Sequence, residues 1–236
     1  MPKKTVSNSV AGFYDEFSKT QIETGINIRH YSILNKLKKA GLKKHHHILE
    51  IGCGIGTLTG LVGKYLSNGK LTALDISPES IEVARKRCRH LPNISFGVSD
   101  MSSFENTEKF DFIIFPDVLE HIPAEQHNPI FKLVSKNLKN DGKIAIHIPD
   151  PIQLDLLRAK EPQSLQIIDQ SLYIQNFATA AADCNLVLDL YERYRLYSSR
   201  PDYNWILFSV KEQLDNNPKQ NKALLKIKEL YWRFLG

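Results

Sequence analysis

Short apolar runs alternate with helix-forming segments through the middle of this chain. The apolar runs predict strands at 48–52, 71–76, 94–100, 110–115 and 143–149. The intervening segments predict helices near 57–67, 78–90 and 126–138. Ser77 is placed to cap the second of these helices, with Pro78 in its first turn. Strands and helices that alternate over short connections indicate a parallel sheet with helices on both faces.

The pattern changes after residue 150. A proline-bounded segment, 151–163, predicts an inserted helix or lid, and a longer helix is expected around 165–182. Two further apolar runs, 187–194 and 204–212, are separated by a polar stretch and predict an antiparallel hairpin at the edge of the sheet. We find no internal repeat and no low-complexity linker, so one domain accounts for the pattern.

The two ends of the chain are expected to be helical. In the last segment an amphipathic helix is predicted, with one face formed by Leu224, Ile227, Leu230, Tyr231 and Phe234. We expect this face to pack back on the domain, with a dimer interface or a membrane surface as the alternatives. The predicted organisation is an N-terminal helical lid or extension over 1–45 and a single domain over 46–236. That domain carries an insertion at about 150–180 and the C-terminal helix at about 219–235.

Composition places the chain among ordinary globular proteins. Its 236 residues are 42% hydrophobic and 24% charged, which allows one sizeable core. No stretch approaches the roughly 18 apolar residues of a membrane span, and the N-terminus lacks the apolar core of a secretory signal. Cys53, Cys88 and Cys184 form no CxxC pair, which argues against a zinc site and favours a cytoplasmic location. The net charge of +5 is spread along helical segments, so solvated surfaces explain it better than an anionic partner.

A glycine-rich turn follows the first predicted strand, in the stretch ILEIGCGIGTLTG at 48–60. A phosphate-binding P-loop needs a Lys-Ser or Lys-Thr pair after its last glycine, and none is present. A dinucleotide fingerprint needs its third glycine at 57, where Thr57 stands. The pattern is instead E-x-G-x-G-x-G, formed by Glu50, Gly52, Gly54 and Gly56, with Cys53 inside the turn. It suits a ligand that needs close approach of the backbone rather than amides for a pyrophosphate.

Acidic residues end the next two strands. Asp75, followed by Ile76, stands where a carboxylate accepts hydrogen bonds from both hydroxyls of a ribose. Asp100 and Met101 end the third strand, where an adenine can be held and its amino group recognised. The glycines and both acids fall at the carboxyl ends of consecutive strands, where open α/β sheets bind ligands. Together they predict one cofactor site along this edge of the sheet.

These stretches resemble the class I S-adenosylmethionine-dependent methyltransferases. LEIGCGIGTLTG is similar to the first motif of that family, LTALDISPESIEVAR to its acidic second motif and VSDM to its adenine-contacting third. FDFIIFPDVLEHIP and LKNDGKIAIHIPDP resemble the strand after the cofactor site and the motif that closes the core. The resemblance covers about 48–150 closely and the hairpin more loosely. It implies an α/β fold with a Rossmann-like, doubly wound, seven-stranded sheet, mostly parallel with one antiparallel strand near the edge, and methyl transfer from S-adenosylmethionine.

The same resemblance implies roles for individual residues. In this family Glu50 is expected to orient the cofactor-binding loop, and Gly52 and Gly54 to line the methionine part of the cofactor. The small-molecule O- and N-methyltransferases are the most similar members, including the ubiquinone-biosynthesis O-methyltransferases. Tyr14 resembles their lid tyrosine, and Arg29 would pair with the cofactor carboxylate, although an amphipathic helix packed on the sheet explains this segment equally well. Asp117, after the fourth strand, completes the expected cofactor site.

Three residues are candidates for the chemistry of transfer: His121, Glu120 beside it, and His147 near the end of the fifth strand. A base is needed only where the acceptor carries a proton that it does not lose unaided, which a hydroxyl does. The ordinary pKa of imidazole, near 6.5, suits proton removal at neutral pH. Either histidine can instead be structural, His121 by shaping its loop and His147 by packing under the neighbouring helix.

The run D-x-x-E-H offers a second interpretation of the loop after the fourth strand. Asp117, Glu120 and His121 supply two carboxylates and an imidazole, which could hold Mg²⁺. The ubiquinone group carries a similar E-x-x-E-H, to which metal binding is attributed. The shorter Asp here, and the D-x-L-E-H of family members not thought to need metal, make a magnesium site the lesser alternative to a site without metal.

The acceptor is the least determined part of the prediction. The segment 191–205 interleaves five aromatic residues with three arginines, which suits a sugar, a phenol, a carboxylated metabolite or a nucleic acid as well as an ordinary edge hairpin. We expect a hydroxyl or amine of a small molecule or glycan, bound by residues from 10–35, 150–180 and 191–205, on a monomer or homodimer.

Two alternatives to this function remain open. An RNA methyltransferase is less favoured, because the chain has no recognisable RNA-binding module and carries FPDV where amino-methylating nucleic-acid enzymes have N/D-P-P-Y/F. The other alternative is an NAD-dependent oxidoreductase or a non-catalytic nucleotide-binding protein. The position of Gly56 and the Asp100-Met101 pair argue against it.

Overall fold

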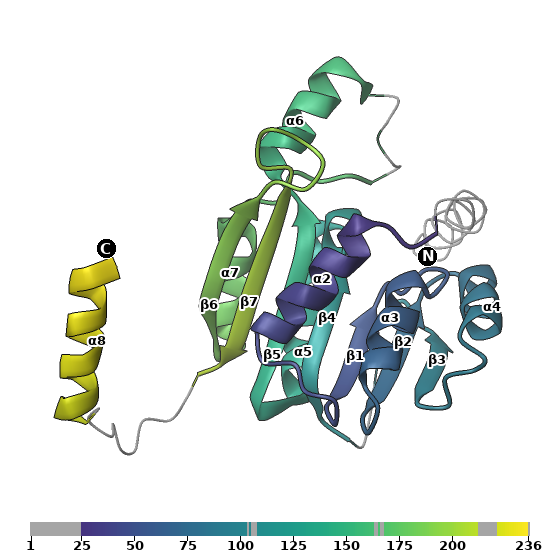
Figure 1. The fold of residues 1–236 in the computed structure, drawn as a ribbon. Helices are drawn as coiled ribbons and strands as arrows, with labels where there is room; N and C mark the ends of the chain where they lie inside the picture. The colour runs from purple at the N-terminus through teal and green to yellow at the C-terminus, as the bar shows by residue number, and fades with distance from the viewer. Residues whose placement is uncertain are drawn as a thin grey trace.

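The computed structural model describes residues 25–102, 104, 108–162, 165, 168–211 and 221–235. Seven strands form one sheet in the order β3-β2-β1-β4-β5-β7-β6 (Figure 1). They are β1 His47–Ile51, β2 Lys70–Asp75, β3 Ile94–Val98, β4 Phe110–Pro116, β5 Leu138–Pro149, β6 Leu186–Tyr194 and β7 Tyr203–Val210. Strand β7 runs antiparallel to β5 and β6, and the other neighbouring pairs are parallel. The predicted seven-stranded sheet, with its antiparallel strand near the edge, is confirmed.

Helices cover both faces of this sheet (Figure 1). They are α2 Ile28–Lys39, α3 Thr57–Tyr65, α4 Pro78–Arg87, α5 His127–Lys136, α6 Pro151–Lys160, α7 Ile174–Asp183 and α8 Lys222–Leu235, with short 3-10 turns η1 Leu119–His121 and η2 Ala124–Gln126. Helices α2, α3 and α4 contribute to one buried apolar cluster, and α5 and α7 to the other. The sheet therefore has two cores, one on each face.

Alternation along the central strands divides their side chains between the two cores. In β4, Phe112 faces the α2 and α3 side while Ile113 faces α5 and α7. In β5, Ile146 faces α5 and α7 while Ala145 faces α2. Because residues two apart on a strand share a face, His147 follows Ala145 toward α2. Both faces are buried, which is why these strands are continuous apolar runs in the sequence.

Element boundaries agree with the prediction at one helix and differ from it at one strand and one helix. The Ser77 hydroxyl accepts a hydrogen bond from the Ser80 amide at 3.0 Å, which confirms the predicted cap of α4. Strand β5 begins at Leu138 rather than 143, because Leu138 pairs with Phe110 before the register shifts. Helix α7 begins at 174 rather than 165. Helix α2 lies within the predicted N-terminal extension, and Tyr14 lies outside the described residues.

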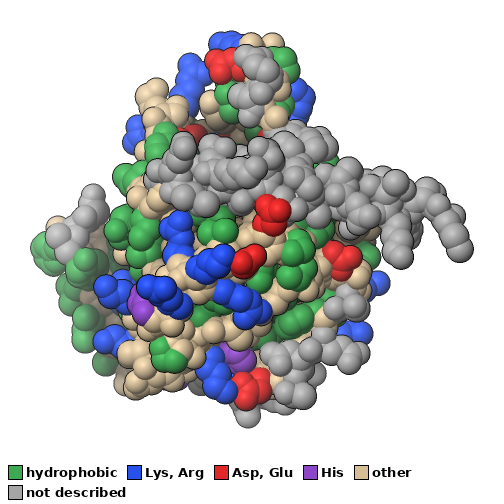
Figure 2. Space-filling model, turned by 90° about the vertical axis from the view of Figure 1, so that its right-hand side faces the viewer, with side chains coloured by type: hydrophobic (Ala, Val, Ile, Leu, Met, Phe, Trp, Pro, Cys, Tyr) green, Lys and Arg blue, Asp and Glu red, His purple; other side chains and the backbone are tan. Residues whose placement is uncertain are grey.

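Charged side chains of both signs are distributed over the surface. On the face that Figure 2 shows, which includes α4, basic, acidic and apolar side chains are interspersed. The basic last turn of α4 carries Arg85, Lys86 and Arg87, and Lys86 pairs with Glu82 one turn earlier at 2.6 Å. Basic side chains at a helix C-terminus offset the negative end of its dipole. The local structure of α4 thus accounts for this group of charges.

Helix α8 forms where it was predicted, but its expected packing on the domain is wrong. Its apolar side chains are exposed, from 48% for Leu224 to 82% for Phe234. Figure 1 shows α8 standing apart from the sheet. Within the described ranges, no helix has the length and apolar character needed to cross a bilayer.

Candidate active site

The turn after β1 depends on glycine at two positions. Gly52 has a φ of 75°, and a Cβ there would lie 2.2 Å from a methyl carbon of Val118. Gly56 has a φ of 77°, and a Cβ there would lie 3.0 Å from the Cβ of Ala84 on α4. The amides of Gly52 and Cys53 both donate to the Leu74 carbonyl, at 2.8 and 3.0 Å. The turn is therefore held against β2 and the loop after β4 at distances that only glycine allows.

Glu50 lies beneath this turn and faces the cavity. Its side chain is fully buried, and neither carboxyl oxygen has a hydrogen-bond partner among the described residues. Burial raises the pKa of Glu50 to about 8; the nearby Thr59 hydroxyl opposes this rise and the Asp75 carboxylate adds to it. A buried acid without a partner is costly. A cationic group in the cavity, such as the ammonium of an amino acid, would satisfy it.

Asp75 connects the turn to the end of β2. One of its carboxylate oxygens accepts from the Gly54 amide at 2.7 Å, and the other from the Ser77 amide at 2.9 Å. These two bonds fix the orientation of the carboxylate at the end of β2. Ile76, between Asp75 and Ser77, also lines the cavity. A carboxylate on the cavity lining is a suitable hydrogen-bond acceptor for a ribose diol.

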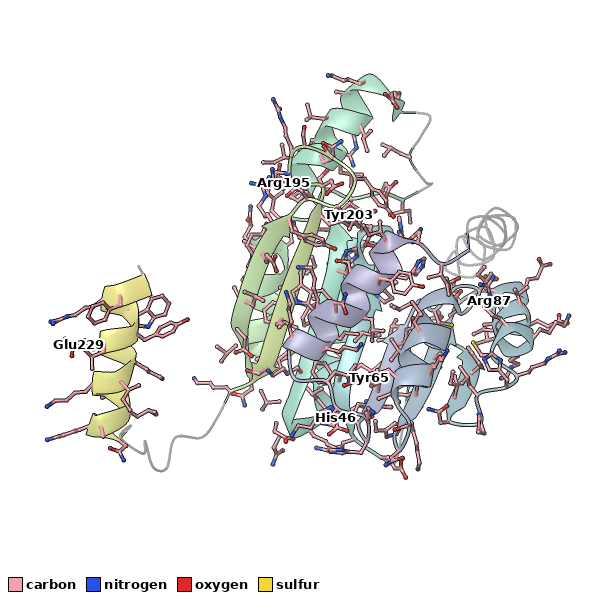
Figure 3. The ribbon with its side chains drawn as sticks, viewed as in Figure 1. His46, Tyr65, Arg87, Arg195, Tyr203 and Glu229 are labelled. Atoms are coloured by element: carbon pink, nitrogen blue, oxygen red, sulfur yellow. The ribbon has the colours of Figure 1, made fainter. Side chains whose placement is uncertain are left out.

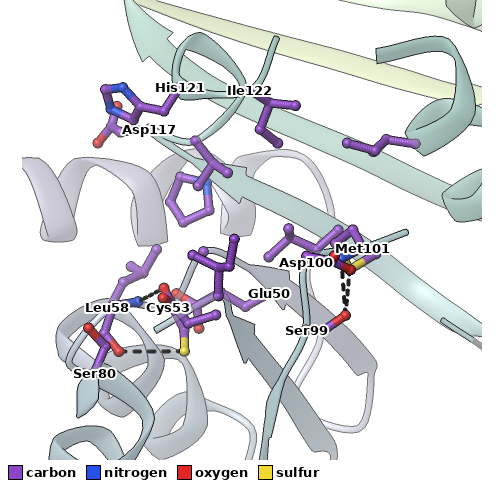
Figure 4. Close-up of a pocket in the computed structure, with 18 of the residues that line it drawn as sticks. Glu50, Cys53, Leu58, Ser80, Ser99, Asp100, Met101, Asp117, His121 and Ile122 are labelled. Atoms are coloured by element: carbon purple, nitrogen blue, oxygen red, sulfur yellow. Dashed lines mark hydrogen bonds between the residues drawn. The ribbon is translucent and has the colours of Figure 1, made fainter. Parts of the chain in front are cut away.

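Asp100 and Met101 form a second turn, after β3. The Asp100 carboxylate accepts from the Ser102 amide at 2.9 Å, and the hydrogen bonds from Ser102 lower the pKa of Asp100. Met101 has a φ of 60°, and its amide donates to the Ser99 hydroxyl at 3.1 Å. Figure 4 shows Asp100 and Met101 on one side of the pocket, with Asp117 and His121 on another. An apolar side chain beside an ionised acid suits a flat heterocycle that carries an amino group.

One cavity of about 1270 Å³ joins these groups. The predicted site residues that line it are Glu50, Gly52, Cys53, Gly54, Asp75, Ile76, Asp100, Met101, Asp117, His121 and Arg29. Three other predicted residues, Gly56, Glu120 and His147, lie behind its wall instead. The structure thus brings together most of the predicted cofactor residues that it describes.

Asp117 is the centre of a polar network behind the loop after β4. It accepts a hydrogen bond from Nδ1 of His147 at 2.6 Å and pairs with Arg29 of α2 at 2.9 Å. Burial opposes ionisation of Asp117, but its interactions with His147 and Arg29 hold its pKa below the usual value. His147 Nε2 lies 2.7 Å from the Tyr194 hydroxyl, and its ring stacks on Tyr203 with centroids 4.6 Å apart. Figure 3 shows Tyr203 near the end of α2.

His121 lies on the cavity wall and is oriented through one ring nitrogen. Its Nδ1 lies 2.6 Å from the Ile168 carbonyl oxygen and 3.4 Å from an Asp169 carboxylate oxygen. Both of these oxygens accept hydrogen bonds, so Nδ1 carries the hydrogen and Nε2 of the neutral ring is the basic nitrogen. Nε2 lies 3.8 Å from the Glu120 carboxyl. The ring is thus held in the tautomer that a general base requires.

Glu120 is buried beside His121. Its side chain is 2% exposed, and neither oxygen has a hydrogen-bond partner in the described part of the chain. Burial, with the Asp117 charge in second place, raises the pKa of Glu120 well above its usual value. This shift favours the neutral acid over the metal-binding carboxylate of the magnesium hypothesis.

The structure does not support that magnesium site. Asp117 is directed at the Arg29 guanidinium and the His147 imidazole, which already occupy both of its oxygens. Glu120 lies behind the cavity wall, and the residues that are described include no group of three His, Cys, Asp or Glu side chains able to hold a metal ion.

Sequence reasoning missed several contacts of the site. The pairing of Arg29 with Asp117 joins segments far apart in the chain, and no local pattern marks it. Asp169 carries no motif, so its place beside His121 is equally hidden. The orientation of His147 could have been found, because the two-residue period of β5 places it on the α2 face.

A profile of the methyltransferase domain matches residues 42–185 of the chain. The chain belongs to this methyltransferase family. Among curated proteins, the methyltransferase is 30% identical over 132 residues to malonyl-[acyl-carrier protein] O-methyltransferase 1 of Ilyobacter polytropus, a match covering 56% of the chain and 46% of the relative. It is 29% identical over 114 residues to trans-aconitate 2-methyltransferase of Rhizobium etli, covering 48% and 43%. The methyltransferase thus spans less than half the length of these relatives.

Solved structures share the fold. The N-methyltransferase NodS of Bradyrhizobium japonicum superposes with a TM-score of 0.60 at 21% identity, covering 78% of this chain and 95% of NodS. Magnesium protoporphyrin IX methyltransferase of Synechocystis, solved with bound SAH, gives a TM-score of 0.61 at 16% identity, covering 77% and 81%. The class I methyltransferase fold predicted from the motifs is thereby confirmed.

Proposed function

We propose that the protein transfers a methyl group from S-adenosylmethionine to a hydroxyl, or an amine, of a small molecule or glycan. The observation that carries this proposal is the single cavity that joins the glycine turn, Glu50 and Asp75 to His121. Its volume, about 1270 Å³, exceeds the roughly 300–1,000 Å³ typical of a site for one small molecule. The cavity therefore has room for a cofactor and an acceptor side by side.

The described residues fit the proposed cofactor. Glu50 supplies an unpaired carboxyl for the ammonium of its methionine part, and Asp75 supplies acceptors for its ribose hydroxyls. Asp100 and Met101 suit the adenine. When bound, the cofactor supplies a methyl group on a positively charged sulfur. Holding two reactants in line is worth about 7–11 kcal/mol of the barrier, so positioning by these residues is a large part of the proposed catalysis.

His121 is the base in this proposal when the acceptor is a hydroxyl. The Ile168 carbonyl holds the hydrogen on Nδ1, which leaves Nε2 to take the proton of the acceptor. Asp169, 3.4 Å from Nδ1, stabilises the imidazolium that forms. An amine acceptor would use the same cavity without needing this step. His147, which lies behind the wall and is bonded to Asp117 and Tyr194, is a positioning residue in this proposal.

The relatives support both acceptor atoms. They include O-methyltransferases that act on malonyl-[acyl-carrier protein] and an N-methyltransferase of Papaver somniferum, (S)-coclaurine N-methyltransferase, at 24% identity. Each match covers less than half of the relative, so the specific substrates are not carried over.

Calorimetric titration with S-adenosylhomocysteine tests the cofactor part. We expect binding by the wild-type protein, a loss of at least tenfold in affinity for Asp75→Ala, and no change for Asp141→Ala, an exposed acid in the turn region at the start of β5. Labelled S-adenosylmethionine then tests the acceptor, with pools of hydroxylated metabolites, amines, glycans and RNA, each with and without EDTA. Label in RNA alone, or no S-adenosylhomocysteine binding at all, would contradict the proposal.

A further inference from the structure

Helix α8 presents an apolar face that the described residues leave uncovered. The large apolar side chains on it are 48–82% exposed: Leu224, Ile227, Leu230, Tyr231 and Phe234. From Ile227 to Phe234 they follow the spacing i, i+3, i+4, i+7, which places them on one side of a helix. Figure 3 shows the side chains of α8 projecting from a helix that stands apart from the sheet.

The opposite side of α8 is basic. Lys222, Lys226 and Arg233 lie there, and Lys228 flanks the apolar face. Glu229 is the one acidic residue of the helix, and it pairs with Arg233 at 3.2 Å. Four basic side chains against one carboxylate give α8 a net positive charge, so a partner that covers it must accept both apolar and cationic groups.

The protein's own sheet offers no surface of that kind among the described residues. The edge strand β6 exposes three aliphatic side chains, Val187, Leu188 and Leu190, at 41–44%. Successive residues on a strand point to opposite faces, and the register shifts between Leu188 and Leu190, so they form no continuous strip. Trp232 is 70% exposed and extends the apolar surface of α8 beyond the narrow seam that pairing with a second helix would bury.

We propose that α8 binds the surface of an anionic lipid bilayer. Amphipathic helices with Lys and Arg on one side and large apolar residues on the other lie in the plane of the membrane interface. Trp and Tyr favour the headgroup level of that interface, which suits Trp232 and Tyr231. The basic side chains contact anionic headgroups. With 14 residues, α8 is too short to span and lies along the surface, which holds the catalytic domain next to the bilayer.

Vesicle co-sedimentation of the full chain tests this inference. Vesicles of phosphatidylcholine with about 30% phosphatidylglycerol are compared with pure phosphatidylcholine vesicles. We expect the anionic vesicles to bind at least tenfold more tightly and the difference to shrink between about 50 and 500 mM salt. Trp232 gives a second signal, because the other tryptophan, Trp205, is 2% exposed and contributes a constant background. Its emission should shift to the blue with anionic vesicles, and Trp232→Phe should remove the shift.

Matched variants separate the apolar face from the rest of α8. Ile227→Glu with Phe234→Glu should weaken vesicle binding at least tenfold, whereas Val187→Glu with Leu190→Glu, which adds the same two charges on the exposed edge strand β6, should change it by less than threefold. Lys222→Gln with Lys226→Gln should weaken binding to the anionic vesicles alone. Binding of S-adenosylhomocysteine reports that the domain is intact in each variant.

Three outcomes would overturn the inference. The first is vesicle binding that is absent or indifferent to lipid charge. The second is a dimer that the Ile227→Glu, Phe234→Glu variant converts to monomers, which would make the face an interface between copies. The third is a lowered melting temperature of that variant without vesicle binding, which would place α8 on its own domain.

Discussion

The Asp117 carboxylate and the His147 imidazole are joined by a hydrogen bond of 2.6 Å that links the loop after β4 to β5. His147 is 1% exposed and Asp117 is 13% exposed, so the bond is largely shielded from water. Arg29 of α2 contacts the other oxygen of Asp117 at 2.9 Å. Asp117 has a φ of 56°, and the next residue, Val118, lies over Gly52. This carboxylate therefore fixes the edge of the cavity to both β5 and the helix above it.

Replacing Asp117 should show how much the network contributes to stability. Asp117→Ala leaves the partly buried Arg29 guanidinium without its carboxylate, and we expect a loss of about 3 kcal/mol in the free energy of unfolding. Asp117→Asn retains an acceptor oxygen and tolerates the positive φ, so it should lose less. Urea unfolding of both variants, of His147→Ala and of the double variant Asp117→Ala with His147→Ala gives the coupling between the two side chains. Equal losses for Ala and Asn would mean that the acceptor oxygen kept by Asn contributes little and that the charge of Asp117 carries the effect.

Glu50 should make stability and cofactor binding depend on pH. Its pKa in the folded protein, about 8, lies above the value of 4.5 expected when unfolded, so the folded state holds this proton more tightly. Stability from this group is present below pH 4.5 and is lost as pH rises toward 8. Glu50→Gln keeps a neutral side chain and should remove that loss, which amounts to at most about 5 kcal/mol. Urea unfolding of both proteins between pH 5 and 8 measures it, and parallel curves would contradict the assignment.

Binding of the proposed cofactor should reverse this pH dependence. A ligand ammonium pairs with the ionised form of Glu50, so the affinity for S-adenosylhomocysteine should rise between pH 6 and 8 in the wild-type protein. Calorimetric titration across that range should show a flat profile for Glu50→Gln. The same rise in both proteins would assign the pH dependence to another group.

The central sheet was predictable because short, local sequence patterns mark its strands and helices. Strands buried on both faces are continuous apolar runs, and Ser77 with Pro78 marks the start of α4. The boundaries that differ depend on contacts made elsewhere in the chain. The early start of β5 follows from the pairing of Leu138 with Phe110, which no pattern within 138–142 reveals.

The candidate site also combines features that local sequence marks with features that depend on distant contacts. The glycine turn, Asp75 and Asp100 were predictable because each ends a strand at the same edge of a parallel sheet. The contacts of Arg29, Tyr194 and Asp169 were not predictable, because they join distant segments of the chain. Arg29 was expected to meet a cofactor carboxylate, and the structure shows it paired with Asp117. Its role toward the cofactor stays a prediction.

Substitutions of His121 and His147 are expected to affect catalysis differently, which can be measured once an acceptor is known. For a hydroxyl acceptor, His121→Gln should lower kcat by about 10²- to 10⁴-fold, because it removes the base on the cavity wall. S-adenosylhomocysteine affinity should change little. His127→Gln is the matched control, since His127 lies in the same region, is buried and contacts the Leu119 and Ile122 carbonyls. A loss of kcat on His147→Gln that exceeds the loss on His121→Gln would transfer the role of base to His147.

Gly52→Ala should abolish cofactor binding for a steric reason that can be isolated. The new Cβ would lie 2.2 Å from Val118, and the alanine would have to adopt a φ of 75°.

Gly41 is the control for backbone strain alone, because its φ is 102° and a Cβ there meets nothing within 4 Å. We expect Gly41→Ala to lower the free energy of unfolding by about 1 kcal/mol and to leave S-adenosylhomocysteine affinity unchanged. Gly52→Ala should lower the free energy of unfolding by about 1–3 kcal/mol more than Gly41→Ala does, and it should also lose the affinity for S-adenosylhomocysteine. Adding Val118→Ala to Gly52→Ala should recover part of both losses, because it opens space for the added methyl group. Thermal unfolding and calorimetric titration of the four proteins measure the two quantities separately. If Gly52→Ala bound S-adenosylhomocysteine as the wild type does, the contact between the glycine turn and the loop after β4 would have no part in shaping the site.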